Sequence, residues 1–315
     1  MATREVKNAA IRVENLVKTF KDVRAVNGVS FAVEEGELFA FLGENGAGKS
    51  TSISVICGLL EKDEGKVYVA GRDTDKSVSV KNEIGVVFQN SVLDKALSAR
   101  DNLCSRAALY GIVGEKFLRR LTELDGLLHF QEFIDRPLSR LSGGQRRKID
   151  IARALIHQPK ILILDEPTTG LDPQTRRTVW EVVEELRKEK KMTVFLTTHY
   201  MEEAAKADYV VILDSGKVAA EGTPHTLKNR YTGDFVLLYG VSPEAAVSAL
   251  GAEWEDKISP LTDGVKIRVE NTAQATGLII SHSGLFVDYE VQKGNMDDVF
   301  LSVTGKTLKE GGGEQ

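Results

Sequence analysis

The chain has 315 residues, of which 42% are hydrophobic and 28% charged, and its formal net charge is −5. This mixture is typical of a globular protein and excludes a fibrous or wholly disordered one. The length suffices for one large domain and one small one. The acidic balance argues against nucleic acid as a partner. We therefore interpret the short basic cluster Arg146, Arg147 and Lys148 as a solvated helix face.

Nothing in the composition indicates a membrane-spanning or secreted chain. No apolar run reaches the roughly 18 residues that a transmembrane helix needs, and the N-terminal stretch MATREVKNAA lacks the apolar segment of a secretory signal. We expect the two cysteines, Cys57 and Cys104, to pack as buried thiols in a reducing compartment. These observations predict a cytoplasmic protein.

The first part of the chain is dominated by predicted strands. Short β-type runs separated by turn pairs fill residues 11–71, and residues 84–89 form another apolar run. A helix is predicted after Gly48, because Ile53 and Ile56 recur at helical spacing. We expect a β-rich N-terminal subdomain.

The middle of the chain alternates between helices and buried strands. Residues 98–157 follow a helical pattern with a capping box that begins at Ser98. Two strongly apolar strands follow at 161–166 and 193–199, and the helix between them opens with Asp172 as its N-cap residue. Strands that alternate with helices predict an α/β core with a largely parallel sheet.

A second domain is predicted after residue 232. The strands DFVLLYG, VKIRVE and LFVDYEV alternate with helical segments. This βαβαβα order over about 80 residues predicts a ferredoxin-like fold. The expected organisation is an α/β domain over residues 1–232, with a helical subdomain over about 91–157, and a small α+β domain over 233–315.

The segment GENGAGKS, residues 43–50, matches the phosphate-binding pattern G-x-x-x-x-G-K-[ST] between a predicted strand and a predicted helix. Its glycines let backbone N–H groups surround phosphates, Lys49 neutralises the β- and γ-phosphates, and Ser50 offers its hydroxyl to Mg²⁺. An ordinary glycine-rich turn is the alternative, and the loop alone indicates only a nucleoside triphosphate. The candidate nucleotide-binding residues here are Gly43, Asn45, Gly46, Ala47, Gly48, Lys49, Ser50 and Thr51.

The segment LSGGQ, residues 141–145, predicts a second anion contact. Ser142 and Gln145 form a capping box at the start of a helix, and Gly143 and Gly144 leave the backbone amides of that turn bare. Taken alone, a well-capped surface helix explains this pattern as well. Because the segment is far in the chain from the phosphate loop, a second subunit is the natural source of its anion.

The apolar strand ILILDE ends in two acidic residues. Asp165 stands at the carboxyl end of the strand, where ligands of open α/β sheets bind, and its carboxylate suits Mg²⁺. Glu166 is then the candidate general base that polarises the attacking water. A solvated turn is the alternative, but it leaves the apolar strand before the two acids unexplained.

These segments together resemble the ABC ATPase family over about residues 11 to 230. GENGAGKS, VVFQN, LSGGQRRKIDIARAL, ILILDEPTTGLDP and LTTHYMEEA occur in the order and spacing of that family. The resemblance implies a P-loop NTPase that binds and hydrolyses ATP with Mg²⁺. It also implies a dimer, in which LSGGQ of one subunit closes over the γ-phosphate held by the other. A homodimer and a heterodimer with another ABC ATPase both stay open.

The resemblance assigns functional roles to four further residues. Gln89 matches the glutamine that reaches Mg²⁺ and the water, and His199 matches the histidine that touches the γ-phosphate and orients Glu166. Asp172 matches the loop that links the two active sites across the dimer. Phe20 matches the aromatic that stacks on adenine, although the family more often has tyrosine, so base selectivity and use of GTP stay open. A core aromatic is the alternative for Phe20.

The class of ABC protein follows from the remaining pattern. The segment between the phosphate loop and LSGGQ lacks the long coiled coil of the DNA-repair relatives, and the single cassette differs from the paired cassettes of the translation-factor relatives. The closing segment NMDDVFLSVTG resembles ATPase subunits of type-2 ABC exporters, such as those for daunorubicin and other drugs. We expect an export ATPase, peripheral on the inner face of the membrane, which drives a transmembrane permease through loops near residues 89–110. An importer ATPase and a non-transport ABC ATPase with a nucleic-acid or ribosomal partner are the alternatives.

Overall fold

The computed structural model describes residues 4 and 6–306, and the glycine run near the C-terminus lies outside them. The chain divides into two compact units, Met1–Glu221 and Gly222–Gln315. The prediction placed this boundary after residue 232. The difference arises because helix α7 (Pro224–Tyr231) contacts helix α10 (Met296–Thr304), so it belongs to the second unit.

The first unit begins with an antiparallel sheet in the order β2-β1-β4-β5. Two long strands, which pair over most of their length, form its centre. Buried residues alternate only in part, because irregularities in the register interrupt the pairing of β1 with β2. The strands are β1 (Ala9–Phe20), β2 (Val23–Glu34), β4 (Glu64–Val69) and β5 (Arg72–Asp73).

A six-stranded sheet in the order β10-β9-β3-β8-β7-β6 forms the core of the first unit. Its strands from β9 to β6 are parallel, as the alternation of strands and helices predicted. Strands β3, β7 and β8 are buried at every residue, which explains why they read as continuous apolar runs. The strands are β3 (Leu38–Leu42), β6 (Ile84–Val87), β7 (Ile161–Asp165), β8 (Thr193–Thr198), β9 (Tyr209–Asp214) and β10 (Lys217–Gly222).

The two sheets share a single apolar core. Four phenylalanine rings lie at its centre, Phe31 of β2 with Phe39, Phe41 and Phe195 of the parallel sheet, and Phe31 lies 5.0 to 5.8 Å from the other three. Aromatic pairs at such separations add about 0.5–1.5 kcal/mol each beyond the area they bury. This cluster packs strand β2 of the antiparallel sheet against strands β3 and β8 of the parallel sheet.

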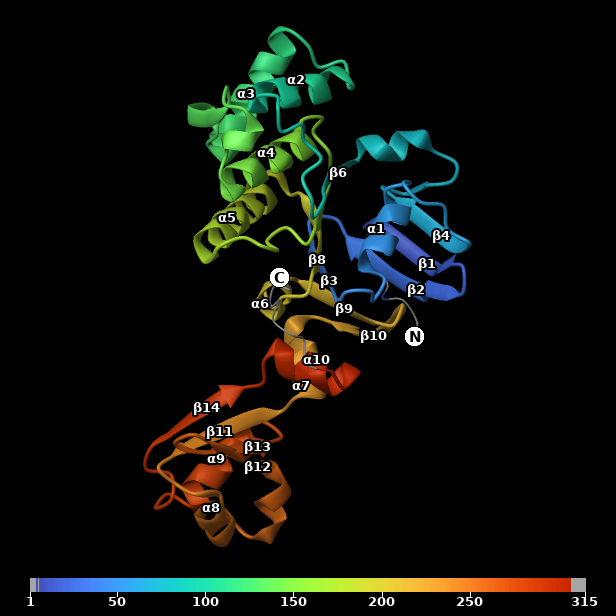
Figure 1. Ribbon diagram of the computed structural model, residues 1–315. Helices are drawn as coiled ribbons and strands as arrows, with labels where there is room; N and C mark the ends of the chain where they lie inside the picture. Colours follow the sequence, from blue (N-terminus) through green and yellow to red (C-terminus); the bar gives the residue numbers. More distant parts are fainter. Residues whose placement is uncertain (1–3, 5, 307–315) are drawn as a thin grey trace. The chain divides into compact units, whose positions relative to one another are not determined.

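Helices α2, α4 and α5 of the first unit begin where the sequence places capping residues. Ser98 accepts a hydrogen bond from the backbone of Asp101, Ser142 forms a complete capping box with Gln145, and Asp172 caps the helix after it. Figure 1 shows α2, α3 and α4 gathered together, apart from the antiparallel sheet. The helices are α1 (Lys49–Ile56), α2 (Ala99–Ala108), α3 (Glu115–Leu128), α4 (Gly143–Leu155), α5 (Pro173–Lys190) and α6 (Met201–Ala204), with 3₁₀ turns at Val78–Asn82, Gln131–Phe133 and Leu138–Arg140.

The two cysteines differ in their exposure to solvent. Cys57 is buried as expected, whereas Cys104 of α2 is exposed, contrary to the prediction. Within residues 4 and 6–306, no helix combines the length and apolar character that crossing a bilayer requires.

The second unit has the ferredoxin-like fold that the sequence predicts. Its sheet runs β12-β13-β11-β14, and helices α8 and α9 contact strands of this sheet. Strand β12 is absent from the sequence prediction, because the short segment ISPL is mostly exposed and contains a proline. The elements are β11 (Asp234–Tyr239), α8 (Pro243–Leu250), a 3₁₀ turn (Ala252–Lys257), β12 (Ile258–Leu261), β13 (Gly264–Val269), α9 (Thr272–Ser281) and β14 (Tyr289–Lys293), followed by α10.

His157, just after α4, is predicted to make the stability of the first unit depend on pH. Its ring stacks on Tyr110 at 4.2 Å, and its Nε2 lies 3.1 Å from the carbonyl oxygen of Ile84. Burial, opposed by the hydrogen bond to Ile84 and reinforced by nearby arginines, lowers the pKa of His157 to about 4. Below about pH 6.5 the His157 ring is therefore protonated in the unfolded chain but stays neutral in the folded protein. The free energy of unfolding falls as the pH falls towards 4.

The measurement is chemical unfolding at pH 7.5 and pH 5.0. His157→Phe keeps a ring beside Tyr110 but has no group that titrates. When the pH is lowered from 7.5 to 5.0, we expect its free energy of unfolding to fall by about 1 kcal/mol less than that of the wild type, after allowance for partial solvent screening. His225→Phe, at an exposed position, is the control and should follow the wild type. An equal pH dependence in wild type and His157→Phe would contradict this account.

Candidate nucleotide-binding and catalytic site

The loop between β3 and α1 depends on glycine at two positions. Gly46 and Gly48 have φ angles of 84° and 103°, in the left-handed region that favours glycine. A Cβ atom on Gly48 would lie 2.4 Å from the carbonyl oxygen of Ala25, so the backbone of β2 leaves no room for a side chain. The turn after β9 also supports the loop, since the N–H of Gly216 donates to the carbonyl oxygen of Ala47 at 3.1 Å.

Lys49 lies at the centre of this loop and is only 4% exposed. Its Nζ donates to the carbonyl oxygens of Gly43 and Glu44 at 2.7 and 3.0 Å, and it lies 3.3 Å from Oε1 of Glu166. Burial lowers the pKa of Lys49, and the adjacent Glu166 carboxylate opposes that effect. The loop thus holds a buried ammonium group whose partners are carbonyl oxygens and one carboxylate.

Glu166 follows the last residue of β7 in a strained backbone conformation, with φ at 45°. Its N–H donates to Oγ1 of Thr197 at 3.0 Å, which ties it to strand β8. Nε2 of Gln89 donates to its Oε2 at 3.1 Å, and Nδ1 of His199 lies 3.4 Å from the same oxygen. Contact with His199, followed by the charge of Lys49, lowers the pKa of Glu166 to about 2 against the effect of burial, so the group is ionised at neutral pH.

Asp165 and Ser50 bring two oxygen donors together beside the loop. Oγ of Ser50 donates to Oδ1 of Asp165 at 3.3 Å, and Oγ1 of Thr197 donates to the same oxygen at 2.6 Å. Mg²⁺ takes few protein ligands and completes its shell with phosphate and water oxygens. This donor set fits such an ion, although the described residues hold no cluster of three or more His, Cys, Asp or Glu side chains for a metal.

Lys49, Ser50, Gln89 and Glu166 line a pocket of about 520 Å³, whereas Asp165 and His199 are not among its lining residues. Phe20, at the end of β1, is 47% exposed and lines the pocket, which excludes the alternative that it is a core residue. Arg24 and Ser215 also line the pocket, although the sequence does not predict them, because a strand start and a hairpin turn carry no motif. The pocket is lined by Phe20, Val23, Arg24, Ala25, Asn45, Gly46, Gly48, Lys49, Ser50, Thr51, Gln89, Glu166 and Ser215.

The candidate residues of LSGGQ lie elsewhere. None of residues 142–145 is among the described residues that line the pocket. They pack instead against the start of α5, where a Cβ atom on Gly144 would lie 2.9 Å from the side chain of Thr175. The N–H of Thr175 donates to Oδ1 of Asp172 at 3.0 Å. The structure therefore brings LSGGQ and Asp172 together, apart from the loop that holds Lys49.

Arg147 corrects one prediction. The basic cluster on α4 was expected to be a solvated face, but Arg147 is only 6% exposed. Its Nη1 donates to the carbonyl oxygen of Phe88 at 2.7 Å, and its Nη2 lies 3.5 Å from the carbonyl oxygen of Glu166. One guanidinium thus joins α4 to the backbone beside Gln89 and to the candidate base. Its five donors suit this role, but the sequence gives no signal that separates it from Arg146.

The parallel sheet, the glycine loop that opens α1 and the acidic end of β7 define a P-loop nucleoside triphosphatase. The family model described as ABC transporter matches residues 26–169. The linearmycin resistance ATP-binding protein of Bacillus subtilis is 36% identical over 95% of this chain and 100% of its own length. The chain belongs to the ABC transporter family as one of its ATP-binding proteins, and it is an ATPase.

Other comparisons agree with this assignment. The Nod factor export ATP-binding protein I of Sinorhizobium fredii is 34% identical over 98% of this chain and 90% of its own length. A dimeric ATP-binding cassette in a post-hydrolysis state, bound to ADP and Pi, is 29% identical. It covers 68% of this chain and 98% of its own, with a TM-score of 0.63. ATPase cassettes of this family bind nucleotide and work as dimers with transmembrane components.

Proposed function

We propose that the protein powers export through a separate transmembrane permease by closing and opening an ATP-bound dimer. The observation that carries the dimer is the separation of LSGGQ from the pocket around Lys49 within one chain. An isologous dimer supplies the missing contact twice, because each subunit gives its LSGGQ segment to the loop of the other. Export is supported by relatives named for export and for antibiotic resistance that match nearly the whole chain, the second unit included.

The residues of the site have distinct proposed roles. Lys49 and the backbone of the loop hold the phosphates, and Phe20 stacks on the base. Ser50 and Asp165, with Gln89 nearby, would hold Mg²⁺, which neutralises phosphate charge when bound. Glu166 accepts the proton of the attacking water, and His199 orients that carboxylate from 3.4 Å. Asp172 and residues 142–145 complete the site in the partner subunit.

Ser142→Arg tests the dimer. Ser142 is exposed at the start of α4, so an arginine fits the monomer but places a long cation where the partner's nucleotide must approach. In the Glu166→Gln background, light scattering should show an ATP-dependent dimer that Ser142→Arg abolishes while ATP binding persists. Ser139→Arg, at an exposed position in the preceding 3₁₀ turn, is the matched control and should still dimerise. A dimer that survives Ser142→Arg would refute the trans arrangement.

Exposed apolar side chains between residues 92 and 118 support docking of a permease on the cytoplasmic face of the membrane. In and around α2, five large apolar side chains are exposed to solvent. Exposed apolar patches mark interaction sites. These residues are Val92, Leu97, Leu109, Val113 and Leu118, which are 58%, 41%, 75%, 58% and 56% exposed.

The test is purification of the full chain from native membranes in mild detergent, followed by mass spectrometry of the proteins that accompany it. We expect a stoichiometric polytopic membrane protein, and we expect Leu109→Glu to lose it. Leu301→Glu, at a 45% exposed position of α10, is the control. Soluble or ribosomal partners alone would favour the non-transport alternative and overturn the proposal.

A further inference from the structure

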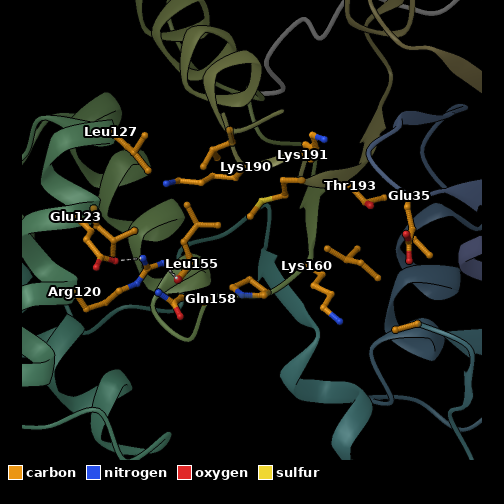
Figure 2. A pocket seen from close by; sticks show the side chains of 17 residues that line it. Glu35, Arg120, Glu123, Leu127, Leu155, Gln158, Lys160, Lys190, Lys191 and Thr193 are labelled. Atoms are coloured by element: carbon orange, nitrogen blue, oxygen red, sulfur yellow. Dashed lines mark hydrogen bonds and ion pairs between the residues drawn. The ribbon is translucent and has the colours of Figure 1, made fainter. Parts of the chain in front are cut away.

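A second pocket of about 580 Å³ lies in the first unit and shares no lining residue with the nucleotide pocket. It is formed by α3, by the carboxyl-terminal ends of α4 and α5, and by the amino-terminal ends of β7 and β8 (Figure 2). Its volume is within the range of ligand sites, about 300–1,000 Å³. Much of its wall is apolar, with contributions from Leu124, Leu127, Leu155, Ile161, Leu186 and Met192.

The charged groups of this pocket leave two cations without a partner. Arg120 pairs with Glu123 at 2.7 Å and donates to backbone carbonyl oxygens at the end of α4, and Lys160 lies 3.4 Å from Glu83. Lys190 and Lys191, at the end of α5, form no ion pair or hydrogen bond through their side chains among the described residues.

The acidic residues of the pocket do not cancel this charge. Glu123 is already paired with Arg120. Glu35 lies on the opposite side of the pocket from Lys190 in Figure 2. Lys190 and Lys191 are exposed and point to different sides of the pocket in Figure 2, so a ligand with an apolar body on the wall and one anionic group pairs with either of them.

The two helices that end in this pocket also carry candidate site residues at their other ends. α4 begins after Ser142 and ends at Leu155, and α5 begins after Asp172 and ends at Lys190. A helix of 13 residues, as α4 is, spans about 20 Å and moves largely as a rigid element. A ligand that joins the ends of both helices to the start of β8 therefore restrains the surface that LSGGQ and Asp172 form.

We propose that this pocket is a regulatory site for a small amphipathic anion, and that its occupancy slows ATP turnover. The proposal that the pocket binds such a ligand rests only on the pocket itself. The proposal that binding slows turnover rests on the proposed dimer cycle. Because that cycle needs the LSGGQ surface to approach and leave the partner's nucleotide, a restraint on α4 and α5 slows it.

Binding is tested with 1-anilinonaphthalene-8-sulfonate, which has an apolar aromatic body and one anionic sulfonate group, and with N-phenyl-1-naphthylamine, which lacks the sulfonate. Titrations use the full chain with saturating MgADP, so that the nucleotide pocket is occupied. We expect one sulfonate probe per chain and at least fivefold weaker binding of the neutral probe. Lys190→Gln/Lys191→Gln should weaken the sulfonate probe roughly fivefold, the order expected for two exposed charges. Lys188→Gln, exposed on the same helix but outside the pocket, is the matched control.

Leu127→Trp, which fills the pocket from its half-buried wall, should abolish sulfonate-probe binding. Circular dichroism verifies that this variant is folded. The anionic specificity would be overturned if the wild type bound both probes with equal affinity. It would also be overturned if the wild type and the double lysine variant bound the sulfonate probe with equal affinity. Unchanged binding to Leu127→Trp would overturn the location of the site.

Regulation is tested by ATP turnover at saturating sulfonate probe. We expect at least a twofold decrease in kcat for the wild type and no change for Leu127→Trp. If the probe binds but turnover is unchanged, the regulatory role is wrong, while the dimer is judged separately by Ser142→Arg. An equal decrease in wild type and Leu127→Trp would place the effect outside this pocket and also refute the proposal.

Discussion

Replacing Glu166 with glutamine is expected to lower kcat for ATP hydrolysis by about a hundredfold or more, with ATP affinity retained. Glutamine keeps the shape of the side chain and an oxygen for Nζ of Lys49, which lies 3.3 Å from Oε1. It removes the only feature that the proposed mechanism needs here, a carboxylate that accepts a proton from water. The loss should therefore appear in the chemical step and not in binding.

The contacts of Glu166 also bear on when the proposed base becomes effective. Contact with His199 and, against the effect of burial, the charge of Lys49 lower the pKa of Glu166 to about 2, too low for an efficient general base at neutral pH. Phosphates of ATP compete with Glu166 for the ammonium group of Lys49, because both need it within hydrogen-bonding distance. We therefore expect nucleotide binding to raise the basicity of the carboxylate as Lys49 turns towards the phosphates.

Single-turnover hydrolysis and equilibrium ATP binding separate the two effects. Glu202→Gln, an exposed glutamate at the start of α6, is the control and should match the wild type in both measurements. Hydrolysis by Glu166→Gln at the wild-type rate would remove Glu166 from the role of base.

The parts of the site that the sequence predicts well are those held by local geometry. The position of Gly48 requires a positive φ and no Cβ, and the start of α4 requires a hydroxyl cap, which Ser142 supplies. Both requirements can be recognised from a few neighbouring residues. The buried runs of β3, β7 and β8 likewise follow from burial on both faces of a parallel sheet. The order of these segments then predicts the fold of the whole first unit.

The parts that the sequence does not predict depend on contacts between distant segments. Arg147 and Arg146 are neighbours of identical type, and only the approach of the backbone after β6 makes Arg147 a buried donor. Ser215 enters the nucleotide pocket because its turn packs on Ala25 and Ala47, far away in the chain. Helix α7 joins the second unit through α10, a contact that no local pattern records.

Lys49→Ala is expected to weaken MgATP binding by about a hundredfold or more. A buried ammonium group that bridges two phosphates makes charge-assisted hydrogen bonds, each of which contributes about 1.5–3 kcal/mol. Alanine removes these contacts and leaves Glu166, 7% exposed, facing the phosphates without its nearest cation. Because Lys49 helps to lower the pKa of Glu166, its loss also raises that pKa.

Isothermal calorimetry with MgATP measures the loss, and thermal unfolding distinguishes a binding defect from a folding defect. Lys66→Ala, at an exposed position of β4, is the control and should bind as the wild type does. Loss of Lys49 leaves the buried Glu166 without its ammonium partner, which lowers stability, while the contacts of Glu166 with Gln89 and His199 remain. A folded Lys49→Ala protein with undiminished affinity would mean that the loop between β3 and α1 does not hold the phosphates.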